Sequence, residues 1–214
     1  LSDVHRQLRN GVRRGLDHCL IRDVTPDELR DQGLELNLDT LARQKRHSEE
    51  FGEKAGWLRF VNAVEECRPF VVATGAFIEG RLAAYIIGCK DGGWMHLLYQ
   101  YSRAELLPLH PNHALAFSVI ARALEDPCVE MISNGPKVLF QEDGLHQFKT
   151  RLGYELEPME VAIQLHPWAA PVLTSRMAVG LAARISSHSP DHAEYAKVSQ
   201  ILECAQRTRM ASSL

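Results

Sequence analysis

Three consecutive β-rich runs, joined only by short glycine-containing connections, constrain this fold more than any other feature of the sequence. The runs cover 70–78, 82–89 and 94–101. The connections between them are Glu79-Gly80 and Asp91-Gly92-Gly93. Glycine readily adopts the positive φ that tight hairpin turns need, so such connections are typical of neighbouring antiparallel strands. The sequence therefore predicts an antiparallel meander in the middle of the chain.

The N-terminal segment 2–16 predicts a helix with one narrow apolar face and a basic surface elsewhere. Its apolar residues recur at every fourth position: Val4, Leu8, Val12 and Leu16. Ser2 is a suitable N-cap, whereas Gly11 and Gly15 weaken the helix. Four arginines make the remaining surface basic: Arg6, Arg9, Arg13 and Arg14. We interpret this basic stripe either as a solvated helix face or as a surface that binds phosphates.

The segment before the meander predicts a strand and two helical regions. A short strand is expected at 19–24. The next residues, from Thr25, favour a helix start, because threonine caps the first turn and Pro26 suits the first helical position. A second helical region covers 39–68 and is interrupted near Phe51. Helices therefore fill the interval between the first strand and the meander.

After the meander, helix and strand patterns alternate. A helix at 112–125 and a strand at 129–133 predict a parallel crossover. A helix at 143–152, ended by Gly153, should follow. Two strands are then expected, at 154–156 and 160–165. The tail from Trp168 predicts one or two amphipathic helices, which we interpret as packing or oligomer contacts, for example in a homodimer.

The order of elements resembles the GNAT (N-acetyltransferase) fold over roughly 19–167. This resemblance implies an α/β (α+β) fold: a mixed central sheet with an antiparallel meander, a splayed parallel strand pair, and helices on both faces. The stretch DGLHQFKTRLGY at 143–154 is similar to the "GL..FK..FG" segment of the Fem-type peptidoglycan-bridge aminoacyltransferases, and 9–15 is similar to their "RN.R.G" segment. We expect a GNAT-like domain at 1–167, including the basic helix 1–16, and a helical extension at 168–214.

The resemblance implies an enzyme that transfers an acyl or aminoacyl group to a small-molecule or peptide amine. Its donor would be acyl-coenzyme A, as a co-substrate and not a permanently bound cofactor, or an aminoacyl-tRNA. One departure bears on the donor. GNAT enzymes hold the pyrophosphate of coenzyme A in a glycine-rich loop after the fourth strand. Here the corresponding segment, 107–114, has no glycine and contains two prolines.

The resemblance places the donor where the fourth and fifth strands separate. The residues there with donor-binding side chains are Gln100, Ser102, His110, Asn112, His113 and Asn134. An amide such as Asn134 both donates to and accepts from a peptide-like group. Asn134 is equally compatible with a turn, because Asn-Gly-Pro favours turns. His110 and His113 are expected to donate hydrogen bonds to an anion at the helix N-terminus.

Lys149, Tyr154 and His96 are the candidate catalytic residues. Lys149 aligns with the lysine of the Fem-type segment, and an ammonium group in the cleft would stabilise the oxyanion of an acyl transfer. The alternative is an exposed helix lysine. Tyr154 is interpreted as a core aromatic residue or as a proton donor. His96 and Glu130 are alternative bases for the amine, or else solvent-facing strand residues.

Composition narrows the classes of function. The net charge of −3 gives no general attraction to nucleic acids or anionic membranes. No apolar run approaches the length that crosses a bilayer, and the five scattered cysteines fit buried, reduced thiols in a cytoplasmic protein. The His110/His113 and His188/His192 spacings have no third ligand nearby in sequence, so we expect no metal site. Two alternatives stay open: a non-catalytic GNAT-like ligand-binding or interaction module, and one half of a tandem enzyme.

Overall fold

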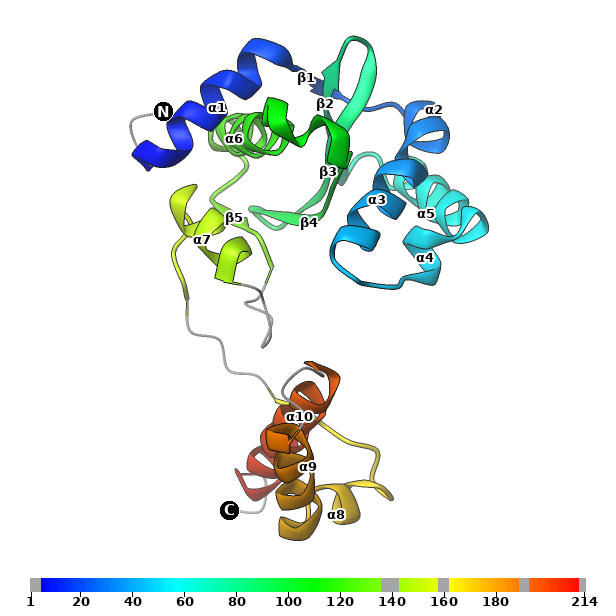
Figure 1. Ribbon diagram of the computed structural model, residues 1–214, viewed down its shortest axis with the longest axis vertical. Coiled ribbons are helices and arrows are strands. Elements are labelled where there is room, and N and C mark those ends of the chain that lie inside the picture. Colours follow the sequence, from blue (N-terminus) through cyan, green and yellow to red (C-terminus); the bar gives the residue numbers. More distant parts are fainter. Residues whose placement is uncertain (1–4, 136–142, 158–161, 189–192, 212–214) are drawn as a thin grey trace. The chain divides into compact units, whose positions relative to one another are not determined.

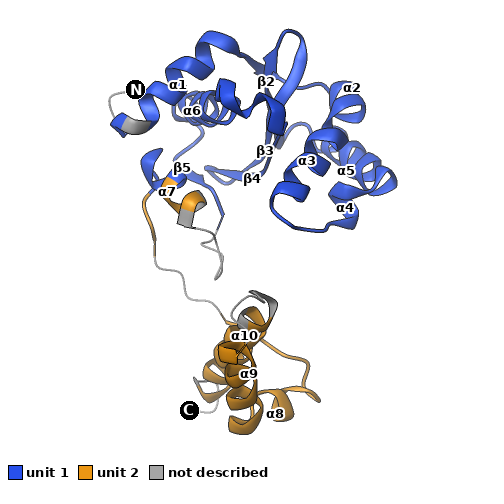
Figure 2. Ribbon diagram, in the orientation of Figure 1, with its two compact units in different colours: residues 1–136, 148–154 blue, residues 137–147, 155–214 orange. Residues whose placement is uncertain are grey.

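The computed structural model describes residues 5–135, 143–157, 162–188 and 193–211. The chain divides into two compact units (Figure 2). The first unit contains 1–136 and 148–154, and the second contains 137–147 and 155–214. The domain boundary expected at 167/168 stays a prediction.

A five-stranded mixed sheet organises the first unit (Figure 1). Its strands lie in the order β1-β2-β3-β4-β5, with the first four antiparallel and β4–β5 parallel. Their bounds are Leu20–Asp23, Val71–Ile78, Arg81–Asp91, Trp94–Ser102 and Met131–Ser133. Gly80, Gly92 and Gly93 all have positive φ at the two hairpin turns. The predicted meander, the crossover and the mixed α/β architecture are thus confirmed.

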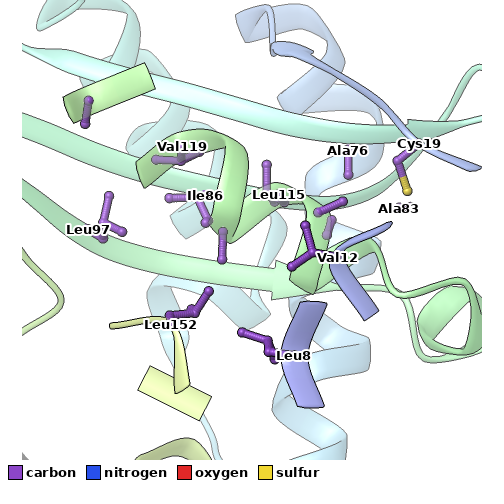
Figure 3. Packing of buried hydrophobic residues seen from close by; sticks show 14 of the residues in the cluster. Leu8, Val12, Cys19, Ala76, Ala83, Ile86, Leu97, Leu115, Val119 and Leu152 are labelled. Carbon is purple, nitrogen blue, oxygen red and sulfur yellow. The ribbon is translucent and has the colours of Figure 1, made fainter. Parts of the chain in front are cut away.

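One face of the sheet is covered by α1 (Arg6–His18), α6 (Pro111–Leu124) and the end of α7 (Asp143–Arg151). Leu8 and Val12 of α1 and Leu115 of α6 join the same apolar cluster as Leu152, which follows α7 (Figure 3). The helix α1 therefore belongs to the same apolar cluster as α6 and the residue that follows α7. A main-chain bond from the His5 N–H to the Arg151 carbonyl, 3.1 Å long, makes the same connection.

The opposite face is covered by the helical segments between β1 and β2 (Figure 1). These are α2 (Pro26–Glu28), the π-helical turn η1 (Leu29–Gly33), α3 (Leu34–Arg43), α4 (Glu49–Gly52) and α5 (Lys54–Glu66). Thr25 caps α2 in a full capping box with Glu28, as the predicted helix start requires. Trp57 is fully buried in this layer, and its indole N–H donates to the Leu29 carbonyl at 2.9 Å.

Among the described residues, the second unit contains the first part of α7 (143–147) and the helices α8 (Ala170–Leu173), α9 (Arg176–His188) and α10 (Ala193–Ala211). The helices α9 and α10 pack on each other. The Gln206 amide and the Arg209 guanidinium on α10 bond the main chain and the side chain of Thr174, at 2.8 and 3.0 Å. In the part of the chain that the structure describes, no helix combines the length and apolar character needed to span a membrane.

Two expectations about local structure were wrong. Residues 154–157 and 162–166 contain no strand, and 158–161 lie outside the described residues. The Ile163 N–H donates instead to the Thr208 hydroxyl of α10, so it serves no strand ladder. The cysteines are also not uniformly buried, since Cys67 and Cys128 are exposed.

The inner face of α1 differs from the expected one, because Gly15 lies on it while Leu16 is 39% exposed. A Cβ atom on Gly15 would lie 2.5 Å from the His110 carbonyl oxygen and 2.8 Å from the Ala114 Cβ. The two glycines of α1 therefore permit a close helix–helix approach, a role that the sequence reading missed. Glycines four residues apart on a helix were the signal that could have indicated it.

Gly15→Ala is expected to destabilise the first unit by about 1–3 kcal/mol, because the methyl group meets main-chain atoms that cannot rotate away. Urea unfolding followed by circular dichroism measures this loss. Gly144→Ala in α7 is the matched control. Its Cβ meets nothing within 4 Å, so it should be neutral or slightly stabilising. Equal stabilities for the two variants would contradict the close approach of α1.

Candidate active site

The strands β4 and β5 pair over only three residues before they separate. Their parallel register ends at His96 opposite Ser133. A β-bulge follows at once in β4, because Ile87 pairs with Tyr99 and Gly88 pairs with Leu97. The extra residue between these pairs, Leu98, increases the local twist and bends the strand. From there to Ser102, no described strand pairs with the β5 side of β4. Thr40 occupies the N–H and the carbonyl of Ser102. The main-chain polar groups of this edge that precede Ser102 are therefore the ones available to a ligand.

Three predicted site residues meet at the end of β5. The Lys149 ammonium donates to the Asn134 carbonyl oxygen at 2.5 Å. Gly153, with φ of +99°, ends α7, and the Tyr154 N–H returns to the Lys149 carbonyl at 3.2 Å. This is a Schellman arrangement, and it turns the chain so that Tyr154 packs against the core beside α6. The helix end therefore fixes Lys149, Tyr154 and Asn134 as one group.

Burial changes the acid–base properties of this group. Partial burial lowers the pKa of Lys149. Burial raises the pKa of Tyr154 to about 12, and the nearby Asn134 side chain offsets a part of that rise. No hydrogen bond of acceptable geometry reaches the buried Tyr154 hydroxyl from the described chain. A buried hydroxyl without a well-aligned partner costs about 1–3 kcal/mol, and the Asn134 side chain is the polar group beside it.

A polar network ties the end of β4 to helices on both faces of the sheet. The Gln100 amide donates to the Asn112 side-chain oxygen at 3.2 Å, and the Asn112 amide donates to the Ser102 hydroxyl at 3.1 Å. From the other face, Arg43 donates to the same hydroxyl at 3.0 Å. Thr40 accepts from the Ser102 N–H and donates to the Ser102 carbonyl, both at 3.0 Å. The structure therefore brings together Gln100, Ser102 and Asn112, which were predicted to bind the acyl donor. Each of their side chains already has a hydrogen-bond partner within the protein.

The N-terminus of α6 offers few main-chain donors. His110 caps it in the left-handed region, with φ of +58°, and makes no side-chain cap. Pro111 has no N–H, while the His113 and Ala114 N–H groups both donate to the His110 carbonyl, at 3.1 and 3.3 Å. Of the N–H groups in the first turn of α6, that of Asn112 is the one without a main-chain partner in the described structure. Since α1 packs on the His110 carbonyl, this helix end differs from an open anion site.

His113 lies between three elements. Its ring contacts His110 and Phe148 edge-on, with centroids 5.2 and 5.4 Å apart, and faces Gly11 of α1. Burial lowers the pKa of His113, and the neighbouring His110 lowers it further. Below about pH 6.5 the His113 side chain therefore binds a proton in the unfolded chain, whereas in the folded protein it does so only at a lower pH.

We expect the wild type to lose stability as the pH falls from about 6.5 towards the lowered pKa of folded His113. His113→Gln removes this titration, so its unfolding free energy should fall less between about pH 7.5 and pH 5.5. Urea unfolding at the two pH values measures the difference. An equal loss in the two proteins would show that His113 is not held neutral.

His96 and Glu130 lie apart from the Lys149 group. Met95 and Leu97 belong to the cluster on the α6 face, so His96 between them points to the opposite face. Its ring stacks on Trp94, with centroids 5.8 Å apart. Glu130 is exposed, next to Gly93. The structure thus does not bring these candidate bases to Lys149, and their role stays a prediction.

The sequence reading did not find Arg103, which directly follows β4. Its side chain is 5% exposed; the Nε–H donates to the Leu82 carbonyl at 2.8 Å, and the guanidinium pairs with Glu35 at 2.6 Å. Arg103 and Glu35 line a shallow depression of about 430 Å³ with Asp39 and Glu105. No spacing in the sequence marks this depression. Among the described residues, this depression included, no three His, Cys, Asp or Glu side chains gather as metal ligands.

The comparison with protein families decides the assignment. Residues 2–149 match the model of the acetyltransferase (GNAT) domain. The chain belongs to the GNAT acetyltransferase family. No protein with a curated description matches the sequence.

Several solved structures resemble this GNAT chain in fold. A possible acetyltransferase from Clostridium difficile 630 has 11% identity and a TM-score of 0.56, over 70% of this chain and 99% of that one. FemX has 14% identity and a TM-score of 0.56, over 71% of this chain and 54% of that one. The PaiA N-acetyltransferase from Thermoplasma acidophilum, solved with coenzyme A, has 16% identity and a TM-score of 0.51, over 66% and 92%. At these identities the likeness concerns the fold alone.

Proposed function

We propose that this GNAT domain transfers an acyl group from a thioester to an amine at the opening between β4 and β5. Acyl transfer to an amine in general follows from the family. The observation that carries the proposal is the group at the end of β5. There a half-buried Lys149 ammonium and the buried Tyr154 hydroxyl flank Asn134, where the sheet opens.

The proposed chemistry assigns one task to each side chain. The amine attacks the carbonyl carbon of the thioester, a C–N bond forms and the C–S bond breaks. Lys149 stabilises the negative charge on the carbonyl oxygen during attack. Tyr154, which burial keeps protonated, donates to the leaving sulfur, and the proton released from the amine returns to the phenolate through water. The open edge of β4 bonds the amide groups of the donor.

The surroundings of the opening bear on the identity of the donor. The α6 N-terminus lacks most of the N–H donors of a pyrophosphate cradle, so acyl-coenzyme A would be held mainly through its pantetheine. An aminoacyl-tRNA needs a broad basic surface. The arginines of α1 and the basic residues of the α3–α4 connection lie on elements that cover opposite faces of the sheet. These positions favour a thioester over a tRNA ester.

The second candidate is a non-catalytic GNAT-like module that binds a ligand or partner. The covered N-terminus of α6 favours it, because a module without catalysis needs no pyrophosphate site. The two functions differ in whether acyl groups are transferred. Ligand binding alone does not separate them.

Turnover separates the two candidates. The protein is incubated with acetyl-coenzyme A or acetyl-pantetheine and a panel of primary amines, and mass spectrometry detects the acylated amine and the free thiol. We expect both products in equal amounts from at least one pair, at rates above the uncatalysed reaction. Thermal shift with saturable donor binding but no product from any pair would instead support the non-catalytic module.

A further inference from the structure

The exposed side of helix α1 carries several arginines. Arg6, Arg9 and Arg13 recur at spacings of three and four residues, opposite the buried Leu8 and Val12. We call the exposed residues of this side, Arg6, Arg13 and Arg14, the α1 arginine surface. None of these three forms a salt bridge with a described residue.

This surface adjoins the elements that bear the candidate active site. The His5 N–H is bonded to Arg151 at the end of α7, two residues from Lys149, and Gly11 and Gly15 lie on the start of α6. Of the other titratable groups nearby, Lys149 and Arg151 are basic, whereas burial favours the neutral form of His113. Asp17, near the end of α1, is the acidic residue within the helix. An acidic partner that docks on α1 would therefore meet positive charge next to the donor opening.

The packing of α1 on the start of α6 also leaves little of the site that would bind the nucleotide end of coenzyme A. Coenzyme A and phosphopantetheine carry the same thioester arm, but only coenzyme A carries the nucleotide and pyrophosphate. Here the pyrophosphate position at the start of α6 has one unoccupied main-chain N–H, at Asn112, and α1 packs against the His110 carbonyl. The strands β4 and β5 still separate after three paired residues, and the phosphopantetheine arm would bind in the opening between them.

From these observations we propose that the donor is an acyl carrier protein, which presents the acyl group on a phosphopantetheine arm and docks its acidic surface on the α1 arginine surface. This inference rests on the proposed function, since it names the donor of that same site. The size of the surface fits a compact partner: thirteen residues span about 20 Å of helix.

The charge distribution favours such a partner over a nucleic acid. The helix α1 has four arginines and one aspartate, a net charge of +3, within a chain of net charge −3, so the remaining residues carry −6. A long polyanion would meet repulsion beyond α1, whereas a small acidic protein would meet only the helix. Complementary charges of this kind raise the association rate and weaken with added salt.

The test measures binding of the phosphopantetheine form of a bacterial fatty-acid acyl carrier protein, labelled with a fluorophore, by anisotropy. The variant Arg6→Glu/Arg13→Glu reverses two charges of the surface. Lys54→Glu/Arg59→Glu reverses two exposed charges on α5, on the other face of the sheet, and is the matched control. We expect salt-sensitive binding by the wild type and the control, and at least tenfold weaker binding by the α1 variant.

Two results would overturn the inference: no binding of the carrier protein, or the same affinity in both variants. Selective binding of an aminoacyl-tRNA through α1, with no carrier binding, would replace it by a nucleic-acid donor. Transfer from acetyl-pantetheine is assayed in parallel, because this small donor reports the chemistry without any docking surface. If that transfer occurs and carrier binding fails, only the inference is lost. If the carrier binds and no donor is turned over, the proposed function is lost instead.

Discussion

Lys149→Met is expected to lower kcat/KM for amine acylation by about 10²–10³-fold, the loss that follows removal of one oxyanion donor. The ammonium is held by the Asn134 carbonyl at 2.5 Å, at the point where β4 and β5 separate. Methionine keeps the length and apolar packing of the side chain but supplies neither charge nor donor. The effect should therefore fall on the reaction and not on the fold.

Initial rates with acetyl-pantetheine and the best amine of the panel measure this effect, and urea unfolding checks the fold. Lys54→Met, an exposed substitution in α5, serves as the control and should keep wild-type rates. Rates for Lys149→Met within threefold of wild type would remove Lys149 from the mechanism.

Trp57→Ala is expected to destabilise the first unit by about 3–5 kcal/mol, the range for deletion of a large buried aromatic side chain. The Trp57 ring packs against Phe51, Phe60 and Tyr85, with centroids 5.6–6.1 Å apart. The substitution leaves a cavity in this cluster. It also leaves the Leu29 carbonyl, at the π-helical turn, without its 2.9 Å hydrogen bond.

Denaturant unfolding with tryptophan-independent detection, by far-ultraviolet circular dichroism, measures this prediction. Trp168→Ala is the control: that side chain is 78% exposed, so its loss should change stability by less than about 0.5 kcal/mol. If Trp57→Ala cost no more than the control, the layer of helices between β1 and β2 would not be packed as described.

The meander and the crossover were predictable because their signals are local. Glycines at the two hairpin turns and β-rich runs between them determine neighbouring strands without any long-range information. The helix start at Thr25 was predictable for the same reason, since a capping box involves residues only three positions apart. Residues 154–156 misled because their alternation fits a strand, while main-chain pairing depends on a partner that only tertiary structure supplies.

The candidate site was predictable only in part. The family resemblance pointed to Asn134, Lys149 and Tyr154, and the structure places them together. It separates His96 from them because a strand alternates its side chains between the two faces. The role of Gly15 and the burial of Arg103 depend on contacts between elements far apart in the sequence. No local pattern contains that information.

The position of the bound donor can be mapped residue by residue. Amide chemical shifts are recorded by NMR while an unreactive thioether analogue of acetyl-pantetheine is added. We expect the largest saturable shifts on β4 from Leu97 to Ser102, and around Asn134, Lys149 and Tyr154. Shifts confined to other surfaces, with these residues unchanged, would show that the opening between β4 and β5 is not the donor site.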